Sequence, residues 1–199
     1  SYQIRPTRRE EAAEVMGIIN AYSNAVLGAA EEAVESLLAD WQTPGLSLET
    51  DSVVVELPDG RLGATAELWD LQETHLRMFG YWRIHPDFRD QGLEERLAEW
   101  IEERARRDVP LALPGARVAL IHRFIDLDKM AERVLLSRGY RIVRRLVRMT
   151  ADLKDSVGQD GPEVIGIRLL PLDETYKEGA IRALHEAFRD HWGAAPESF

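Results

Sequence analysis

The sequence predicts an α/β domain whose mixed sheet carries helices on both faces. Runs of alternating apolar residues are concentrated in residues 52–84, and strands then alternate with helical patterns as far as residue 139. Consecutive strands followed by strand–helix alternation are typical of a mixed sheet with a helix layer on each side. The composition, 45% hydrophobic and 30% charged, is that of a globular chain that can bury a full core.

The first fifty residues predict a short strand and two helices. Residues 3–5 read as a short strand. Thr7 is then expected to be a helix N-cap, and Glu10 three residues later completes a capping box. We expect this helix to end at Gly28 and a second helix to occupy about residues 31–41.

Three strands follow. Residues 52–57 and 62–68 are two apolar runs joined by the turn signal at 58–60, which predicts a hairpin. Residues 76–84 form a third run with period two. Gly80 inside this run indicates a bulge or a close approach of another group to the backbone.

The next segment alternates between helix and strand. Apolar residues at helical spacing predict a helix over residues 90–107, and residues 116–124 predict a strand. Residues 128–137 predict a short helix that ends at Gly139, a suitable glycine for the position after a helix. Residues 140–153 again have the composition of a strand.

The chain is expected to contain one domain and the beginning of another. Residues 1–153 make the first domain, and the polar, glycine-containing stretch 154–162 is predicted to be a linker. Residues 163–199 repeat the opening of the chain, because a short Ile-Arg strand precedes an apolar helix in both. They are interpreted as the first strand and helix of a second, truncated module; alternatively, they dock on the single domain.

Composition and charge exclude several classes of function. The formal net charge of −10 argues against a nucleic-acid partner, because phosphate backbones recruit basic patches. With no cysteine, the chain cannot have a thiolate zinc site or a cysteine nucleophile. The five histidines lack metal-ligand spacing, so no metal is predicted. No apolar run reaches the roughly 18 residues of a membrane span, and we expect a cytoplasmic protein that does not bind membranes.

The junction between the third strand and the following helix could bind an anion. A helix N-terminus presents unpaired backbone N–H groups and a partial positive charge to a phosphate or pyrophosphate. Gly92 lies in the first turn, where a ligand approaching the main chain would collide with a Cβ atom. Arg89 could add a bidentate contact to the same anion.

Residues 84–92 resemble the signature of the GNAT superfamily of N-acetyltransferases. In that signature an apolar strand and a proline precede (Gln/Arg)-x-x-Gly-x-(Gly/Ala), which opens a long helix. Residues 131–140 are similar to the family's later helix, which ends in Gly-Phe or Gly-Tyr, and the resemblance covers about residues 2–153. Residues 187–192 resemble the first helix of the second half of tandem-GNAT proteins, the group that includes mycothiol synthase.

The resemblance implies a fold, a reaction and a cofactor site. Acetyl-CoA, as the acyl donor, would lie where the parallel strands 76–84 and 116–124 splay apart, and a small-molecule or peptide amine would attack its thioester directly. The pantetheine would pair with the main chain of one strand, and the pyrophosphate would contact the helix N-terminus. The implied cofactor-binding residues are Trp82, Arg83, Ile84, Arg89, Asp90, Gln91, Gly92, Leu93 and Glu94.

Three departures from the family pattern keep a second reading open. Glu94 stands where the signature has a small residue, and Leu135 stands where the family often has the tyrosine that protonates the leaving thiolate. Asp128 replaces a frequent asparagine. The alternative is therefore a catalytically degenerate GNAT-like module that binds coenzyme A or only supports a second domain. A third reading is an unrelated α/β domain.

Candidates for the general base lie on or near the strands that would border the substrate cleft. Glu73 and His75 rank first, and both are expected in the polar loop before residue 76. Glu67 is interpreted as a surface residue, because it alternates with an apolar set, and His122 as a core histidine. Trp41, Trp69 and Trp100 are interpreted as packing residues. Residues 163–199 could also pack on a neighbouring chain, which would make a homo-oligomer.

Overall fold

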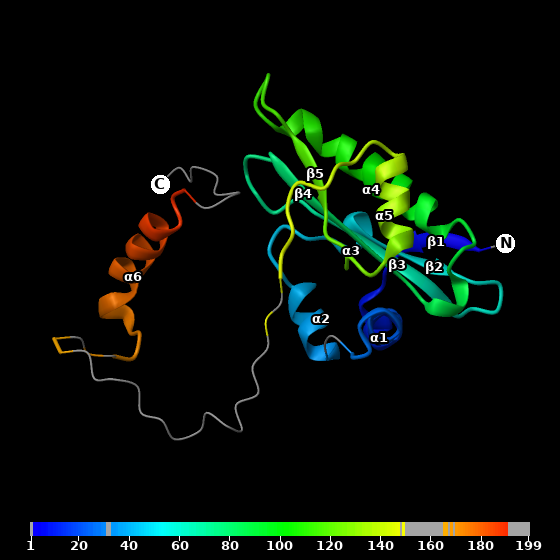
Figure 1. The fold of residues 1–199 in the computed structure, drawn as a ribbon, viewed down its shortest axis with the longest axis horizontal. Coiled ribbons are helices and arrows are strands. Elements are labelled where there is room, and N and C mark those ends of the chain that lie inside the picture. The colour runs from blue at the N-terminus through cyan, green and yellow to red at the C-terminus, as the bar shows by residue number, and fades with distance from the viewer. Residues whose placement is uncertain are drawn as a thin grey trace. The chain divides into compact units, whose positions relative to one another are not determined.

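A five-stranded sheet organises the first part of the chain, with the strand order β1-β2-β3-β4-β5 (Figure 1). Neighbouring strands are antiparallel except β4 and β5, which are parallel. This confirms the predicted mixed, mostly antiparallel sheet of an α/β fold. The strands are β1 (Gln3–Pro6), β2 (Ser52–Glu56), β3 (Leu62–Trp69), β4 (Arg77–Ile84) and β5 (Ala119–His122).

The structure is a computed structural model that describes residues 2–30, 33–147, 149, 165–166, 168 and 170–190. The chain divides into two compact units, Ser1–Arg145 and Leu146–Phe199, and each is described by itself. The predicted linker, residues 154–162, lies outside the described residues. In the second unit the described residues form helix α6 (Glu174–Ala187), where the sequence predicts a helix.

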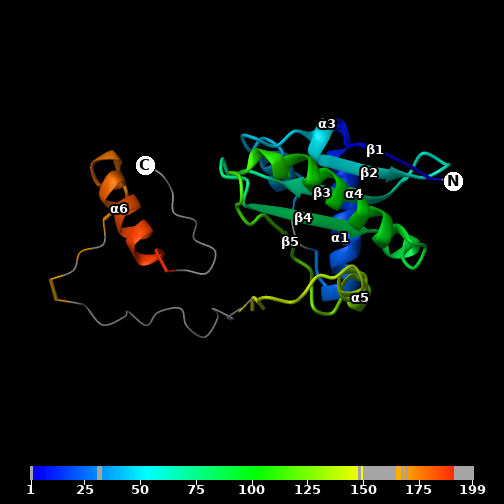
Figure 2. The ribbon, with the colours of Figure 1, turned by 90° about the horizontal axis from the view of Figure 1, so that it is seen from above.

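Helices cover both faces of the sheet in the first unit, as predicted (Figures 1 and 2). Helices α1 (Ala12–Leu27) and α2 (Val34–Asp40) pack on one face with a core that includes Val54 and Leu62. Helices α4 (Leu93–Asp108) and α5 (Lys129–Ser137) pack on the other, against side chains such as Leu68 and Trp82. The remaining helical segments are α3 (Leu48–Asp51) and the short 3-10 turns Arg9–Glu11, Pro86–Phe88 and Val109–Leu111.

The first helix begins later than the capping box at Thr7 and Glu10 predicts. The hydroxyl of Thr7 is buried and lies 2.7 Å from that of Ser52, so it is occupied by β2 rather than by a helix N-terminus. Glu11 accepts a hydrogen bond from the main-chain N–H of Arg8 at 2.9 Å. The capping interaction is therefore displaced by one residue, because a tertiary contact competes for the threonine.

The parallel strands β4 and β5 are paired over only half the length of β4. Their register runs from Arg77 opposite Ala119 to Gly80 opposite His122, where β5 ends. Strand β4 continues to Ile84, paired there with β3 alone. The two parallel strands therefore part after Gly80, as the predicted splay requires.

Gly80 marks a close approach, which was one of the two alternatives read from the sequence. A Cβ atom at this position would lie 2.6 Å from Cε1 of His122 and 2.6 Å from Cγ2 of Ile101. The β3–β4 register shows no shift here, so Gly80 is not at a bulge. Only glycine lets β5 and α4 come this near to the strand.

The strand predicted over residues 140–153 is absent from the described part of this range, residues 140–147 and 149. Residues 141–147 are exposed, and no strand is assigned to them. A strand exists only by hydrogen bonding to a neighbour, and β5 pairs with β4 but not with this segment. Residues 148 and 150–153 lie outside the described residues, as does Ile167, which belongs to the predicted strand of the second module.

We predict that Gly80→Ala lowers the free energy of unfolding by about 1–3 kcal/mol, because the new methyl group overpacks the contact between Ile101 and His122. Gly17→Ala is the matched control. Gly17 is an exposed glycine of α1 with open space around it, so the change should be neutral or stabilise the protein by up to about 1 kcal/mol. Urea denaturation of the three proteins measures both, and equal effects would contradict the role of Gly80.

Candidate functional site

The loop from β4 to α4 presents main chain to solvent at the predicted anion site. Asp90, Gln91 and Gly92 are exposed, and Asp90 and Gly92 have positive φ angles of 59° and 77°. Gly92 is the N-cap of α4, and a Cβ atom placed on it would have no neighbour within 4 Å. The loop that leads into α4 is therefore open to solvent next to the helix N-terminus, where the sequence predicts the anion site.

Arg89 is held by the protein itself instead of facing solvent. Its Nη2 forms an ion pair with Oδ1 of Asp128, and its Nε lies 3.8 Å from a carboxylate oxygen of Glu94. Asp128 is only 3% exposed and caps α5 by accepting a hydrogen bond from the N–H of Ala131 at 3.1 Å. The hydroxyl of Tyr22 donates to the other oxygen of Asp128 at 2.8 Å. One carboxylate thus joins α1, the β4–α4 loop and α5.

Glu94 is buried in the first turn of α4, at the position where the family signature has a small residue. It is 1% exposed, and its two carboxylate oxygens have no hydrogen-bond partner among the described residues. Burial raises the pKa of this carboxyl group, which favours its neutral form. Leu93, its neighbour, packs in the core.

Side chains fill the gap where β4 and β5 part. The ring of His122 lies 5.1 Å from that of Trp82 and 5.1 Å from that of Tyr140, and the cavity left between the strands is about 10 Å³. That volume holds about one water molecule. The cavity is lined by Tyr22, Gly80, Trp82, Arg83, His122, Arg123, Phe124, Ala131 and Leu135.

The main chain of β4 beyond Gly80 is partly engaged. The guanidinium of Arg83 donates to the carbonyl oxygen of Trp82 at 2.9 Å and lies 4.9 Å from the centre of the Tyr22 ring. The side chains of Trp82 and Ile84 are buried in the core beneath α4. The carbonyl of Trp82, where a pantetheine is expected to pair, is therefore already hydrogen-bonded within the protein.

The two predicted base candidates lie on the loop between β3 and β4. Glu73 is exposed. The Nδ1 atom of His75 lies 2.6 Å from a carboxylate oxygen of Asp70, and His75 has a positive φ of 51°. Neither Glu73 nor His75 lines the pocket described next.

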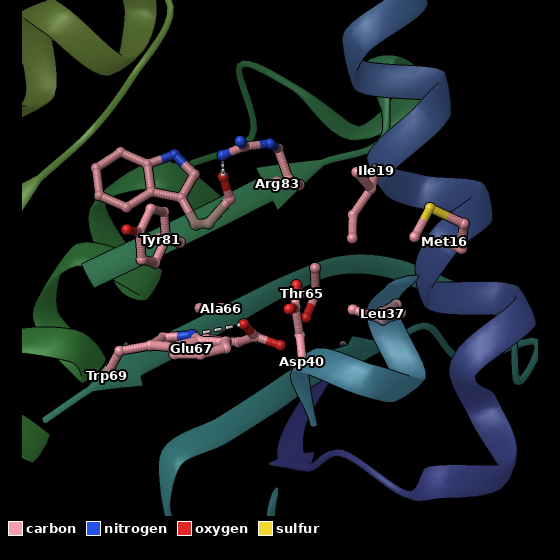
Figure 3. Close-up of a pocket in the computed structure, with 11 residues that line it drawn as sticks. Met16, Ile19, Leu37, Asp40, Thr65, Ala66, Glu67, Trp69, Tyr81 and Arg83 are labelled. Atoms are coloured by element: carbon pink, nitrogen blue, oxygen red, sulfur yellow. Dashed lines mark hydrogen bonds between the residues drawn. The ribbon is translucent and has the colours of Figure 1, made fainter. Parts of the chain in front are cut away.

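A pocket of about 360 Å³ opens between α1, α2, β3 and β4 (Figure 3). In Figure 3, Arg83 and Tyr81 extend from β4 on one side, and Glu67 and Thr65 extend from β3 on the other. Apolar side chains of α1 and α2 close one end. The lining residues are Met16, Ile19, Leu37, Asp40, Thr65, Ala66, Glu67, Trp69, Tyr81, Trp82 and Arg83.

Glu67 is the residue that sequence reasoning misplaced. Its Oε1 accepts a hydrogen bond from Nε1 of Trp41 at 2.8 Å, and its Oε2 accepts one from Nε1 of Trp69 at 2.8 Å. Burial raises the pKa of its carboxyl group. The surface interpretation is wrong because β3 is a central strand with helices over both faces, so alternation alone cannot identify an exposed face. The available signal was Trp69, two residues on and therefore on the same face.

Solved structures of other proteins are similar to this chain. No protein-family model and no curated protein sequence matches the chain. It is similar to the crystal structure of a GCN5-related N-acetyltransferase from Sphaerobacter thermophilus, with a TM-score of 0.65 and 28% identity over 70% of the chain. A GCN5-related N-acetyltransferase from Kribbella flavida gives a TM-score of 0.56, 16% identity and coverage of 72% of this chain and 84% of that one.

The chain has the GNAT fold. A further similar structure is yncA from Salmonella typhimurium with its cofactor acetyl-CoA, with a TM-score of 0.56, 17% identity and coverage of 72% of this chain and 81% of that one. The chain spans only 43% of the length of the Sphaerobacter structure. The three structures named here are thus two GCN5-related N-acetyltransferases and one further acetyltransferase.

The described part of this GNAT fold contains neither a helix that could span a membrane nor a cluster of metal ligands. Among the described helices, none combines the length and the apolar character that crossing a membrane requires. Within the same residues, no group of three or more histidine, aspartate or glutamate side chains could hold a metal ion.

We predict that Asp128→Ala lowers the free energy of unfolding by about 3 kcal/mol or more, because it removes the α5 cap and leaves the charge of Arg89 without its main partner. Tyr22→Phe, which removes only the hydroxyl that donates to Asp128, should cost about 1.5–3 kcal/mol. Asp126→Ala is the control: its pair with Arg145 is exposed on both sides, so the change should stay within about 0.5 kcal/mol. Chemical denaturation measures all three.

His122 predicts a pH dependence of stability. Burial lowers its pKa from 6.5 to about 4, so between these values the unfolded chain binds a proton that the folded protein does not. The stabilisation is complete above pH 6.5 and is lost as the pH falls towards 4. The difference in the free energy of unfolding between wild type and His122→Gln should therefore become smaller as the pH is lowered through this window. Denaturation curves at several pH values measure it. A difference that does not change with pH would contradict the prediction.

Proposed function

We propose that the chain is an acyl-CoA-dependent N-acyltransferase that uses acetyl-CoA as donor and an amine as acceptor. The observation that carries the proposal is the separation of β4 and β5 after Gly80, followed directly by the exposed main chain of residues 90–92 at the start of α4. In this proposal the pantetheine enters between the strands and the pyrophosphate lies on the helix N-terminus. The residues proposed for these contacts are those implied by the sequence: Trp82, Arg83, Ile84, Arg89, Asp90, Gln91, Gly92, Leu93 and Glu94.

The reaction proposed is direct transfer. The amine nitrogen forms a bond to the thioester carbonyl carbon, the carbon–sulfur bond breaks, and coenzyme A leaves as a thiolate that takes up a proton. The amine loses one proton to a base. Glu73 and His75 remain sequence-based proposals for that base. Glu67, which lines the pocket and accepts hydrogen bonds from Trp41 and Trp69, is a third candidate.

The site fits the donor only in part, and this favours a second candidate function. The exposed loop at residues 90–92 suits a pyrophosphate, but a cavity of about 10 Å³ does not admit a pantetheine arm unless His122 and its aromatic neighbours move. Arg89 is paired with Asp128, and Leu135 stands where the family often has its general-acid tyrosine. The second candidate is therefore a GNAT-like module without catalytic activity.

The C-terminal residues are proposed to begin a second module. The support is helix α6, which has the position predicted from the echo of the first helix. A small-molecule or peptide amine as acceptor, and self-association through residues 163–199, complete the proposal. Sedimentation of the chain with and without these residues tests the self-association.

Binding and turnover of acetyl-CoA separate the two candidates. If the chain is an acyltransferase, acetyl-CoA raises the melting temperature and the thioester is consumed in the presence of a panel of amines. We expect Gly92→Ala to weaken acetyl-CoA binding about tenfold or more, since the new Cβ atom meets the ligand at its closest approach to the main chain. Calorimetry measures the binding, and thiol release measures the turnover.

Gly60→Ala is the matched control for Gly92→Ala. Gly60, in the turn before β3, also has a positive φ (83°) and open space around it, so the backbone strain is the same but the proposed site is untouched. Equal binding by both variants would contradict the placement of the pyrophosphate. Binding without thiol release would favour the non-catalytic module, and no binding at millimolar acetyl-CoA would overturn the proposed function.

A further inference from the structure

The pocket between α1, α2, β3 and β4 has an uneven distribution of charge. Two carboxylates, Glu67 and Asp40, line it together with one guanidinium, that of Arg83. Arg83 is already engaged by the Tyr22 ring and the carbonyl of Trp82. Two carboxylates outnumber the one guanidinium, so the lining has an excess of negative charge whose complement is a cation.

Two hydrogen bonds hold the carboxylate of Glu67 in the lining of the pocket. Each of its oxygens receives one indole N–H, from Trp41 and from Trp69, so the carboxylate cannot turn away from the pocket. Both donors are neutral, and they orient the group without neutralising its charge. A carboxylate oxygen has more than one lone pair, so Glu67 can still accept from a ligand. A half-buried charge whose hydrogen-bond donors are neutral is costly, and burial accordingly raises the pKa of Glu67; a cationic ligand would offset that cost.

The other walls limit the size and the character of the ligand. Met16, Ile19 and Leu37 form an apolar surface next to the acidic side, seen at the right of Figure 3. A volume of about 360 Å³ lies near the lower end of the range for small-molecule sites. The ligand that fits is compact, with one ammonium group and an apolar body.

The pocket is adjacent to the gap between β4 and β5. Trp82 and Arg83 line both the pocket and the small cavity at the gap. A nitrogen bound beside Glu67 would therefore lie on one side of Trp82 and Arg83, and the acyl group is proposed to lie on the other side. This adjacency is what an acceptor site requires, since the amine must reach the thioester carbonyl carbon.

We propose that this pocket binds a small primary amine as its ammonium ion, with Glu67 as the counter-ion and the apolar side chains of α1 and α2 around its carbon body. The binding of the ammonium ion stands on the pocket alone; its role as acetyl acceptor rests on the proposed function. For transfer, an N–H bond of the ammonium breaks and the proton passes to a carboxylate oxygen of Glu67. The neutral amine then forms the new bond to the acyl carbon, the carbon–sulfur bond breaks, and coenzyme A leaves as a thiolate that takes up the second proton lost by the nitrogen.

The test is a pair of titrations on the 199-residue chain without acetyl-CoA. The probes are 2-phenylethylamine and isopentylamine, each with its neutral counterpart, 2-phenylethanol or isopentyl alcohol, followed by calorimetry and by indole N–H signals of Trp41 and Trp69 in NMR spectra. We expect the amines to bind and the alcohols to bind at least about tenfold more weakly. Amines and alcohols that bind equally, or no binding of either amine, would overturn the proposal.

Glu67→Gln and Glu49→Gln form the matched pair of variants. Glu67→Gln removes the charge from the pocket and should weaken amine binding about tenfold or more, with little effect on the alcohols. Glu49→Gln removes an exposed carboxylate of α3 outside the pocket and should change neither. If Glu67→Gln is destabilised, Trp69→Phe keeps the charge but removes one orienting donor, and a smaller loss of amine affinity is expected. Unchanged amine affinity in folded Glu67→Gln would also overturn the proposal.

Acetyl transfer is measured separately, so the two proposals can fail independently. Amine binding that depends on Glu67 with no consumption of acetyl-CoA would leave the pocket assignment standing and remove the proposed reaction. Transfer to the probe amines that is equally fast in wild type and Glu67→Gln would retain the reaction and place the acceptor elsewhere. A lysine-containing tripeptide that binds more tightly than either small amine would exclude the small-amine class.

Discussion

The contact of Gly80 with His122 and Ile101 determines how the rest of this sheet is arranged. It brings β5 and α4 against β4 at one point, and the parallel pairing ends there. Beyond that point the strands part, and the sheet must fill the space with side chains. The rings of Trp82, His122 and Tyr140 do so, and the low pKa of His122 is one consequence of their packing.

Asp128 holds together three segments of the chain beside the gap between β4 and β5. Its carboxylate caps α5 and accepts from Tyr22, and its ion pair holds Arg89 at the start of the α4 loop. Three segments distant in sequence therefore depend on one buried charge. The same ion pair occupies Arg89, so an anionic ligand would have to compete with Asp128 for this side chain.

The buried Glu94 and the half-buried Glu67, on opposite sides of the sheet, have different surroundings. Glu94 faces the α4 side without a hydrogen bond among the described residues, and burial raises its pKa. Glu67 faces α1 and α2 with an indole N–H on each oxygen. Burial raises the pKa of both carboxyl groups, but only Glu67 has neutral indole donors that fix its orientation towards a pocket.

The sequence by itself determined the order of the helices and strands from β1 to α5 and the place of the β4–α4 junction, because apolar periodicity, glycine and proline act within a few residues of chain. It also identified Gly80 as exceptional and placed a helix where α6 lies. Only the tertiary structure decided what depends on neighbours distant in sequence. Thr7 bonds to Ser52 instead of capping a helix, and residues 140–147 lack the partner strand they would need. Glu67 is covered because two helices pack over its face of β3, and no local pattern within β3 could indicate that.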